Sequence, residues 1–300
     1  MMLVNTVICG DALATLKELP DACVNMCCTS PPYHLQRDYG VDGQLGLEPT
    51  YTEYITKLCD VFDEVKRVLK PEGTLWVNLA DNFSGSGGKR KSPKMRSKRT
   101  AYMGGVGVHI PPTDIPKKSL CLIPFRFAIE MVRRGWLVRN VVIWHKWNAT
   151  PDSMKDRFTI DYELIFFFSK SPHYYFEQQF EPTVDSKTRQ NGQLWRNKRS
   201  VWTIPTRPSP CKGHYATYPE ELVETPIKAG APPGGIVLDC FSGTATTACV
   251  AKRLGRQYIG IELNSTYVEL GNKRLASVVP DHVDMSSKQE NSDLLQASER

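Results

Sequence analysis

Short apolar runs alternate with longer amphipathic segments along most of the chain, from residue 4 to residue 279. Several of the apolar runs are rich in β-branched side chains and lack strict alternation of polar and apolar positions. Such runs are typical of strands that are buried on both faces of a sheet. They predict strands near 4–9, 24–29, 74–79, 140–146, 162–169, 236–241 and 257–262.

The segments between these strands have the spacing of amphipathic helices. This pattern predicts helices at 51–69, 123–134, 248–254 and 267–278. Lys70-Pro71-Glu72-Gly73 closes the first of them and Gly135 closes the second, as expected of helix-terminating residues. Strands that alternate with helices predict a doubly wound α/β sheet.

A proline-rich loop, Ser30-Pro31-Pro32-Tyr33, follows the strand predicted at 24–29. Because proline has no backbone N–H, the loop presents mainly carbonyl acceptors, with the Ser30 hydroxyl beside them. Two such acceptors can hold the N–H groups of an exocyclic amine on a nucleobase, whose lone pair is otherwise delocalised into the ring. Tyr33 can stack on a flipped-out base. Taken alone, a Pro-Pro pair more often simply ends a strand, and it is a second motif that shifts the interpretation to amine methylation.

A second loop, near the C-terminus, has the features of a nucleotide-cofactor site. The strand predicted at 236–241 leads into the small residues of 242–247 and then into a helix. The next strand ends at Glu262, about twenty positions after Asp239, which is the spacing of such cofactor sites. In strand, loop, helix, strand units of this kind the loop holds an adenosine cofactor, and the acidic residue accepts hydrogen bonds from the ribose hydroxyls.

Together the two loops resemble those of the β-class DNA amino-methyltransferases, which use S-adenosylmethionine and carry the catalytic tetrapeptide N-terminal to the cofactor loop. The resemblance covers most of residues 3–279. It implies the seven-stranded class I methyltransferase sheet, circularly permuted so that the usual first two strands come from the C-terminal part. The family's loop, Asp-Pro-Phe-x-Gly-Ser-Gly-Thr, is matched at Asp239, Phe241, Gly243 and Thr246, while Cys240 replaces the proline and Ala245 the second glycine.

The resemblance also implies which residues form the two sites. Gly10-Asp11 matches the family's contact with the cofactor adenine. A lysine common near the methionine end is Tyr218 here, so the amides at the helix start after Thr244 are expected to bind the methionine carboxylate. The implied cofactor-binding residues are Asp11, Thr29, Asp239, Phe241, Gly243, Thr244, Thr246 and Glu262, and the implied catalytic residues are Ser30, Pro31, Pro32 and Tyr33.

Ser30 favours cytosine over adenine as the target base. In the family, N4-cytosine enzymes usually carry Ser at this position and N6-adenine enzymes usually carry Asp. We therefore interpret the sequence as an S-adenosylmethionine-dependent DNA methyltransferase that acts on the N4 amine of a flipped-out cytosine. N6-adenine methylation of DNA is the alternative. A non-catalytic nucleic-acid-binding protein of the same fold is a further alternative, which the intact motifs disfavour.

Composition favours a cytoplasmic enzyme associated with DNA. The chain has 300 residues and is 41% hydrophobic, which is enough for a large core. No apolar stretch approaches the roughly 18 residues of a membrane span, and the N-terminus lacks the pattern of a signal peptide. Nine cysteines without Cys-x-x-Cys spacing argue for reduced thiols and against a zinc site or a disulfide framework.

The net charge of +6 is modest, but two stretches concentrate positive charge. The run 89–99 follows a strand end beside the catalytic loop and is expected to contact phosphates, although a solvated loop or a localisation signal is the alternative. The stretch 187–199 mixes cations with amides that can read base edges, and is the candidate for target recognition. The predicted DNA-binding residues are Lys89, Arg90, Lys91, Lys94, Arg96, Lys98, Arg99, Arg189, Asn191, Arg196, Lys198 and Arg199.

These assignments divide the chain into four parts. We expect a catalytic half at 1–171 with a basic insertion at 84–118, a target-recognition segment at 172–212, a cofactor-binding half at 213–279 and a disordered polar tail at 280–300. The implied partner is double-stranded DNA, with a cognate restriction endonuclease as a functional companion. For the oligomeric state, the sequence allows a monomer or a homodimer.

Replacing the seven basic residues of 89–99 by alanine is expected to weaken DNA binding across all sequences. Each lost phosphate contact should flatten the slope of log affinity against log salt by about 0.9, while sequence preference changes little. Binding titrations over a salt series measure this slope. An unaltered slope would assign the run to a solvated loop or a localisation signal.

Overall fold

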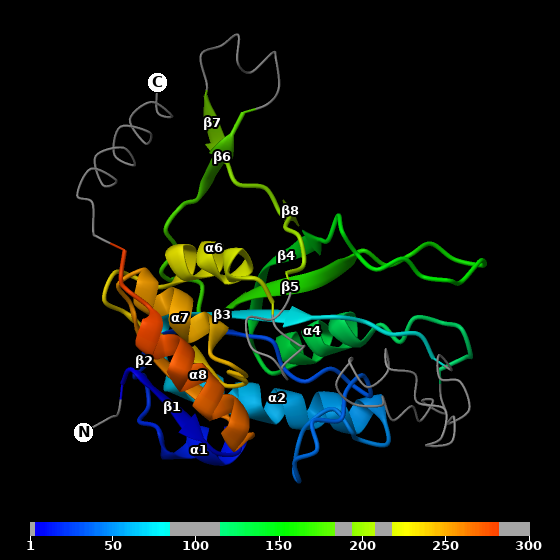
Figure 1. Ribbon diagram of the computed structural model, residues 1–300, viewed down its shortest axis with the longest axis horizontal. Helices are drawn as coiled ribbons and strands as arrows, with labels where there is room; N and C mark the ends of the chain where they lie inside the picture. The colour runs from blue at the N-terminus through cyan, green and yellow to red at the C-terminus, as the bar shows by residue number, and fades with distance from the viewer. Residues whose placement is uncertain (1–3, 85–114, 184–193, 208–217, 282–300) are drawn as a thin grey trace.

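In the computed structural model, which describes residues 4–84, 115–183, 194–207 and 218–281, an eight-stranded sheet separates two layers of helices (Figure 1). Every pair of neighbouring strands is parallel except the two pairs that β5 makes. In spatial order the strands are β1 (Thr6–Cys9), β10 (Gln257–Glu262), β9 (Ile236–Asp239), β2 (Val24–Thr29), β3 (Leu69–Leu79), β5 (Tyr162–Ser169), β4 (Leu137–His145) and β8 (Val201–Thr203).

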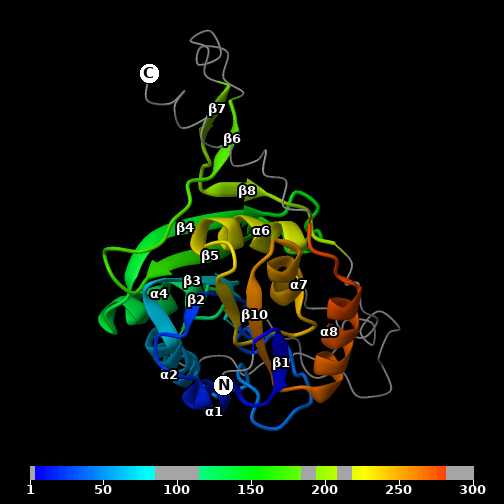
Figure 2. The same cartoon turned by 90° about the vertical axis from the view of Figure 1, so that its left-hand side faces the viewer.

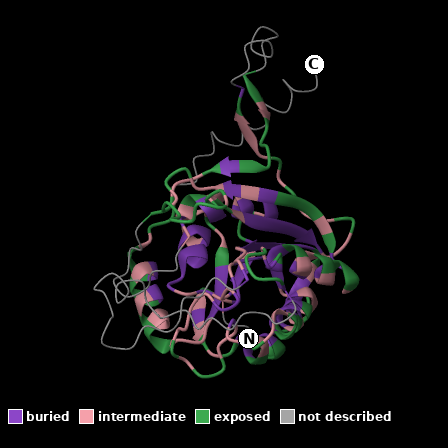
Figure 3. Ribbon diagram, turned by 90° about the vertical axis from the view of Figure 1, so that its right-hand side faces the viewer, coloured by how far each residue is buried: buried purple, intermediate pink, exposed green. Residues whose placement is uncertain are grey.

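Successive side chains of the central strands enter two different cores. On β3, Leu75 and Val77 pack with α1 (Ala12–Glu18), α2 (Tyr51–Val68) and α4 (Ile123–Arg133). Trp76 lies on the opposite face, stacked on Phe167 at 4.2 Å, and packs with α6 (Glu220–Gly230), α7 (Thr246–Arg253) and α8 (Ser265–Ser277). Figures 2 and 3 show the helices on both sides of the sheet and the buried residues between them. The predicted doubly wound fold is confirmed.

All seven predicted strands and all four predicted helices are present, with shifts at their ends. The bounds of β2, β5 and β10 agree with the prediction. β9 ends at Asp239 rather than residue 241, because the Phe241 N–H turns back to donate to the Asp239 side chain at 3.1 Å. β3 begins at Leu69 rather than residue 74, because Leu69 already pairs with Val24 of β2 across a register shift.

Several elements were not predicted from the pattern of the sequence. α1 is only seven residues long and α6 contains Pro226, so neither has a typical helical signature. β6 (Phe180–Pro182) and β7 (Trp195–Asn197) form a hairpin that projects from the sheet region (Figure 1). β8 pairs with β4 and adds an eighth strand to the expected seven, so the large sheet takes in part of the segment 172–212.

The sheet is connected as the predicted circular permutation requires. β9 and β10, from the C-terminal part, lie between β1 and β2. Asn5 N–H donates to the Tyr258 carbonyl at 2.7 Å, and Asp281 N–H donates to the Arg253 carbonyl at 2.8 Å. Arg253 and Tyr258 flank the short turn between α7 and β10. The two ends of the described core are therefore neighbours.

Parts of the predicted organisation fall outside the described residues. The basic run 89–99 lies there entirely, as does nearly all of the predicted tail.

Within the described ranges, no helix is long and apolar enough to cross a bilayer, and no three His, Cys, Asp or Glu side chains are placed to hold a metal ion. Burial raises the pKa of the Cys27 and Cys28 thiols well above the ordinary value, so both stay protonated and unreactive.

Candidate active site

The two predicted motifs begin at the ends of neighbouring parallel strands. Thr29 ends β2 and Asp239 ends β9, and these strands pair in the sheet. The Thr29 hydroxyl donates to Asp239 Oδ1 at 2.6 Å, although the two residues are 210 positions apart in the sequence. The strand order reverses between β9 and β2, and the carboxyl ends of strands at such a point are where doubly wound sheets bind ligands.

Asp239 is 1% exposed and joins the two motifs. Besides Thr29, its carboxylate accepts from the Thr247 hydroxyl at 2.6 Å, the Tyr218 hydroxyl at 3.1 Å and the Phe241 N–H at 3.1 Å. Burial raises the pKa of Asp239, and these hydrogen bonds act in the opposite direction. Neither Asp239 nor Thr29 lines either of the two cavities at these strand ends, and the hydrogen bond between them ties the two loops together.

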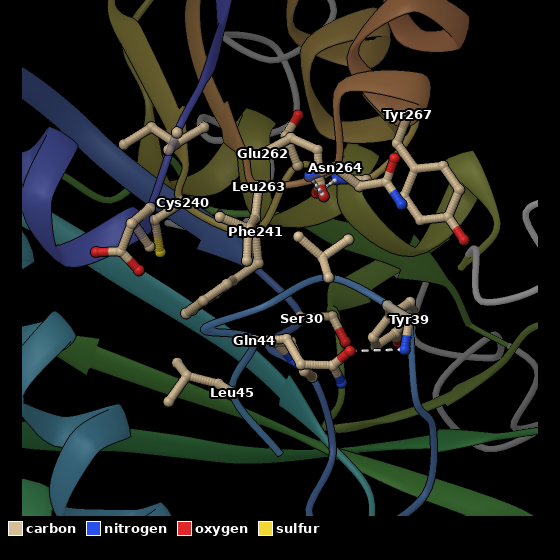
Figure 4. Close-up of a pocket in the computed structure, with 18 of the residues that line it drawn as sticks. Ser30, Tyr39, Gln44, Leu45, Cys240, Phe241, Glu262, Leu263, Asn264 and Tyr267 are labelled. Atoms are coloured by element: carbon tan, nitrogen blue, oxygen red, sulfur yellow. Dashed lines mark hydrogen bonds between the residues drawn. The ribbon is translucent and has the colours of Figure 1, made fainter. Parts of the chain in front are cut away.

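A first cavity opens above these strand ends (Figure 4). It is lined by residues that follow β1, by the loop between β9 and α7, by the end of β10 and by the loop 39–45. Figure 4 shows Glu262 and Asn264 across the cavity from Ser30 and Gln44. The predicted residues that line it are Asp11, Phe241, Gly243, Thr244, Thr246, Glu262, Ser30 and Pro32.

Glu262 is placed to accept hydrogen bonds from a ligand in the first cavity. Its two carboxylate oxygens accept from the Gly243 N–H and the Asn264 N–H, each at 2.8 Å. Each oxygen has a second lone pair that can accept from a ribose hydroxyl. Burial raises the pKa of Glu262, while the two backbone N–H groups oppose that change. Two backbone N–H groups therefore fix this side chain at the wall of the first cavity.

The start of α7 offers backbone amides to the same cavity. Thr244 and Thr246 line it, and the first-turn N–H groups of a helix have no carbonyl partner within that helix. Ala245 has φ of 64°, a conformation that the glycine of the family's loop adopts without steric cost. The Tyr218 hydroxyl is used by Asp239 and by a short contact with Thr247, so it cannot replace the charge of the family's lysine.

The loop 39–45 contributes a wall that was not predicted. Tyr39, Val41 and Leu45 line the first cavity, and the Tyr39 N–H donates to Gln44 Oε1 at 2.8 Å. Tyr267 of α8 meets the Tyr39 ring edge-on at 6.5 Å. The loop carries no recognisable motif. The only signal in the sequence is its apolar positions between glycines, directly after the catalytic loop.

A second cavity lies on the other side of Ser30. Ser30, Tyr39 and Tyr218 line both cavities, whereas Pro31 and Tyr33 line only the second. Its far wall comes from β3, β4 and β5 and the residues that follow them, and consists of Asn78, Trp144, Lys146 and Glu163. Trp144 of β4 lines this cavity, and its indole N–H donates to the Ile204 carbonyl at 2.8 Å.

The Ser30–Tyr33 loop is held by α2. The Tyr54 hydroxyl donates to the Pro32 carbonyl at 2.8 Å, so this carbonyl is already used by a hydrogen bond within the protein. Pro31, which lines the second cavity, precedes it. The Ser30 hydroxyl and the Pro31 carbonyl therefore belong to residues on the wall of the second cavity.

Only three of the predicted DNA-binding residues are described by the structure. Arg196 and Arg199 donate to Glu181 Oε1 at 2.9 and 2.6 Å, and Lys198 lies 5.6 Å from the Trp202 ring centroid. In this structure the two arginines brace the hairpin. Lys89, Arg90, Lys91, Lys94, Arg96, Lys98, Arg99, Arg189 and Asn191 lie outside the described residues.

Residues 24–273 match the model of a protein family described as DNA methylase. The chain is 40% identical over 267 residues to type II methyltransferase M.Cfr9I of Citrobacter freundii, covering 89% of this chain and 86% of that protein. Its fold matches the cytosine-N4-specific PvuII DNA methyltransferase with a TM-score of 0.67 at 19% identity, over 98% and 92% of the two chains. A putative DNA modification methylase of Thermus thermophilus, solved with S-adenosyl-L-methionine, matches with a TM-score of 0.62 at 25% identity, over 92% and 95%.

The fold is thus that of an S-adenosylmethionine-dependent methyltransferase. The chain belongs to the DNA methylase family of N4 and N6 amino-methyltransferases. The predicted family and cofactor are confirmed. The first cavity fits that cofactor, because it combines a fixed carboxylate for hydroxyls, aromatic walls and helix-start amides for a carboxylate. When bound, S-adenosylmethionine supplies a methyl group activated by its sulfonium sulfur.

Replacing Glu262 by alanine should weaken cofactor binding about tenfold to a hundredfold, because a charged hydrogen bond contributes about 1.5 to 3 kcal/mol. Isothermal titration calorimetry measures the affinity, and thermal unfolding checks that the fold survives. Glu269, in α8 and absent from the lining of both cavities, provides the matched control as Glu269→Ala. Unchanged binding in Glu262→Ala would remove this residue from the site.

Proposed function

We propose that this protein transfers a methyl group from S-adenosylmethionine to the exocyclic N4 amine of a cytosine that is extruded from double-stranded DNA into the second cavity. The observation that carries the proposal is the position of Ser30, which lines the first and the second cavity alike. A base in the second cavity then presents its amine next to the cofactor cavity, with Ser30 at the junction.

The walls of the second cavity suit a planar base. Tyr33 and Trp144 provide aromatic surface, and stacking on an aromatic ring contributes about 1 to 3 kcal/mol per base. The Ser30 hydroxyl and the Pro31 carbonyl are the acceptors for the two N–H groups of the amine. Holding both N–H groups favours the pyramidal nitrogen of the transition state over the flat ground state, which raises the rate rather than the affinity.

The choice of cytosine rests on Ser30. This residue type is usual in N4-cytosine members of the family, and the PvuII enzyme, which shares the fold, is a cytosine-N4-specific methyltransferase. Catalysis requires no nucleophilic side chain, because the exocyclic nitrogen itself is the nucleophile. This agrees with a second cavity whose described lining residues include no cysteine.

Cationic side chains surround the second cavity. Arg37, Lys146 and Arg207 line it, and Arg196, Lys198 and Arg199 lie in or directly after β7 of the separate two-stranded β6–β7 hairpin. We assign phosphate contact to the basic run 89–99 and target recognition to the segment 172–212. As a type II methyltransferase, the protein would act on DNA in the cytoplasm beside a cognate restriction endonuclease, as a monomer or a homodimer.

The proposed product is tested by digesting DNA from cells that express the protein and identifying the modified nucleoside by mass. N4-methylcytosine is the expected product. N6-methyladenine instead would overturn the choice of base while leaving amine methylation intact.

Ser30→Ala should lower the single-turnover rate about tenfold or more, the effect of one lost acceptor, with cofactor affinity unchanged. Transfer at the wild-type rate would contradict the acceptor role of Ser30.

A further inference from the structure

A line of hydrogen bonds leads from Ser30 away from the cofactor cavity and ends at a carboxylate on β5. The Ser30 hydroxyl donates to Tyr33 Oη at 3.2 Å, and the Tyr33 hydroxyl donates to Glu163 Oε2 at 2.7 Å. Asn78 Nδ2 donates to both Tyr33 Oη and Glu163 Oε2, at 2.8 and 2.7 Å. Lys146 donates to the other oxygen of Glu163. The catalytic loop and three strand regions of the sheet thus share one polar network.

Glu163 determines which group donates and which accepts in each of these hydrogen bonds. An ionised carboxylate has no hydrogen to give, so the single hydroxyl hydrogen of Tyr33 must point toward Glu163. The Asn78 amide cannot be turned around, because its carbonyl oxygen would then face the carboxylate. Tyr33 Oη therefore offers only lone pairs to its neighbours. The Ser30 hydroxyl donates to this oxygen, and the Ser30 lone pairs remain available to accept.

The surroundings keep the network in this state. The side chains of Glu163 and Lys146 are 13% and 17% exposed, so the charge on Glu163 is balanced by a neighbouring cation rather than by bulk water. Burial and the Glu163 charge raise the pKa of Tyr33 well above its ordinary value, so its hydroxyl keeps the hydrogen that it donates. Hydrogen bonds in such a partly dry site polarise one another and have a strong directional preference.

We propose that Glu163 is a positioning residue for methyl transfer: acting through the Tyr33 hydroxyl, it orients the Ser30 hydroxyl so that Ser30 accepts a hydrogen bond from the substrate amine. This inference rests on the proposed amine methylation. It also gives Tyr33 a second role, because the predicted stacking on the base needs only the ring. Asn78 and Lys146 hold the glutamate in place.

Replacing the Glu163 carboxylate by an amide should reverse the direction of donation in the hydrogen bonds that join Ser30, Tyr33 and Glu163. In Glu163→Gln the amide can donate to Tyr33, whose hydroxyl hydrogen is then free to turn toward Ser30. Ser30 would in turn direct its hydrogen at the amine and no longer accept from it. In Tyr33→Phe the stacking ring is kept, but Ser30 loses the acceptor that holds its hydrogen.

Single-turnover methyl transfer at saturating cofactor and DNA is the measurement. Both Glu163→Gln and Tyr33→Phe are expected to lower the rate about tenfold to a hundredfold, with cofactor affinity by calorimetry unchanged. Glu163→Asp, which keeps the charge, should retain more activity than Glu163→Gln. Glu64 on α2 is also a partly buried glutamate paired with a cation, Arg67, and Glu64→Gln is the matched control that should leave the rate unchanged.

A double-mutant cycle separates positioning from a merely structural role. In a Ser30→Ala background there is no hydroxyl left to orient, so Glu163→Gln and Tyr33→Phe should cause little further loss. If the rate losses of Ser30→Ala and Glu163→Gln multiply in the double variant, the inference is overturned. A wild-type rate in the Glu163→Gln variant would overturn it as well. If those results come from a protein that still methylates the DNA amine, the proposed function stands. A wild-type protein that transfers no methyl group to DNA would overturn both.

Discussion

The buried carboxylate of Asp239 is the constraint on which both cavities depend. Removing a charge from water is costly unless hydrogen bonds replace the hydration, and Asp239 receives donors from Thr29, Thr247, Tyr218 and Phe241. These donors come from the catalytic strand, the cofactor loop, the helix that follows it and the segment before α6. They can meet only if β2 and β9 are neighbours, which the permuted connection of the sheet provides.

Around this centre the two halves of the sheet have separate tasks. The residues after β1, β9 and β10 shape the cofactor cavity, whereas β3, β4 and β5 shape the second cavity. Ser30 stands where the two meet, and its hydroxyl is oriented from the second side by Tyr33 and Glu163. In the proposed function, the first side therefore holds the cofactor, while Ser30 and the walls from β3, β4 and β5 receive the target base.

Much of the fold and of the site could be predicted because the signals are local. Buried parallel strands appear as apolar runs, and the motifs at Ser30 and Asp239 each lie in a few consecutive residues. α6 was missed because Pro226 interrupts its pattern, and the wall at Tyr39 because no motif marks it. The hydrogen bond between Thr29 and Asp239, 210 positions apart, could not be read from the sequence, because it exists only once β2 lies beside β9. The partnership of Tyr33 with Glu163, 130 positions apart, exists only once β5 lies beside β3.

The central claim is that a flipped base is held between the two motifs with its amine at Ser30. A crystal structure of the protein with a non-reactive cofactor analogue and a duplex containing its target site tests this most directly. We predict the cofactor analogue on Glu262 in the first cavity and the extruded cytosine between Tyr33 and Trp144, with its N4 nitrogen within hydrogen-bond distance of Ser30 Oγ and the Pro31 carbonyl. A base that stays stacked in the duplex, or an amine placed away from Ser30, would contradict the account.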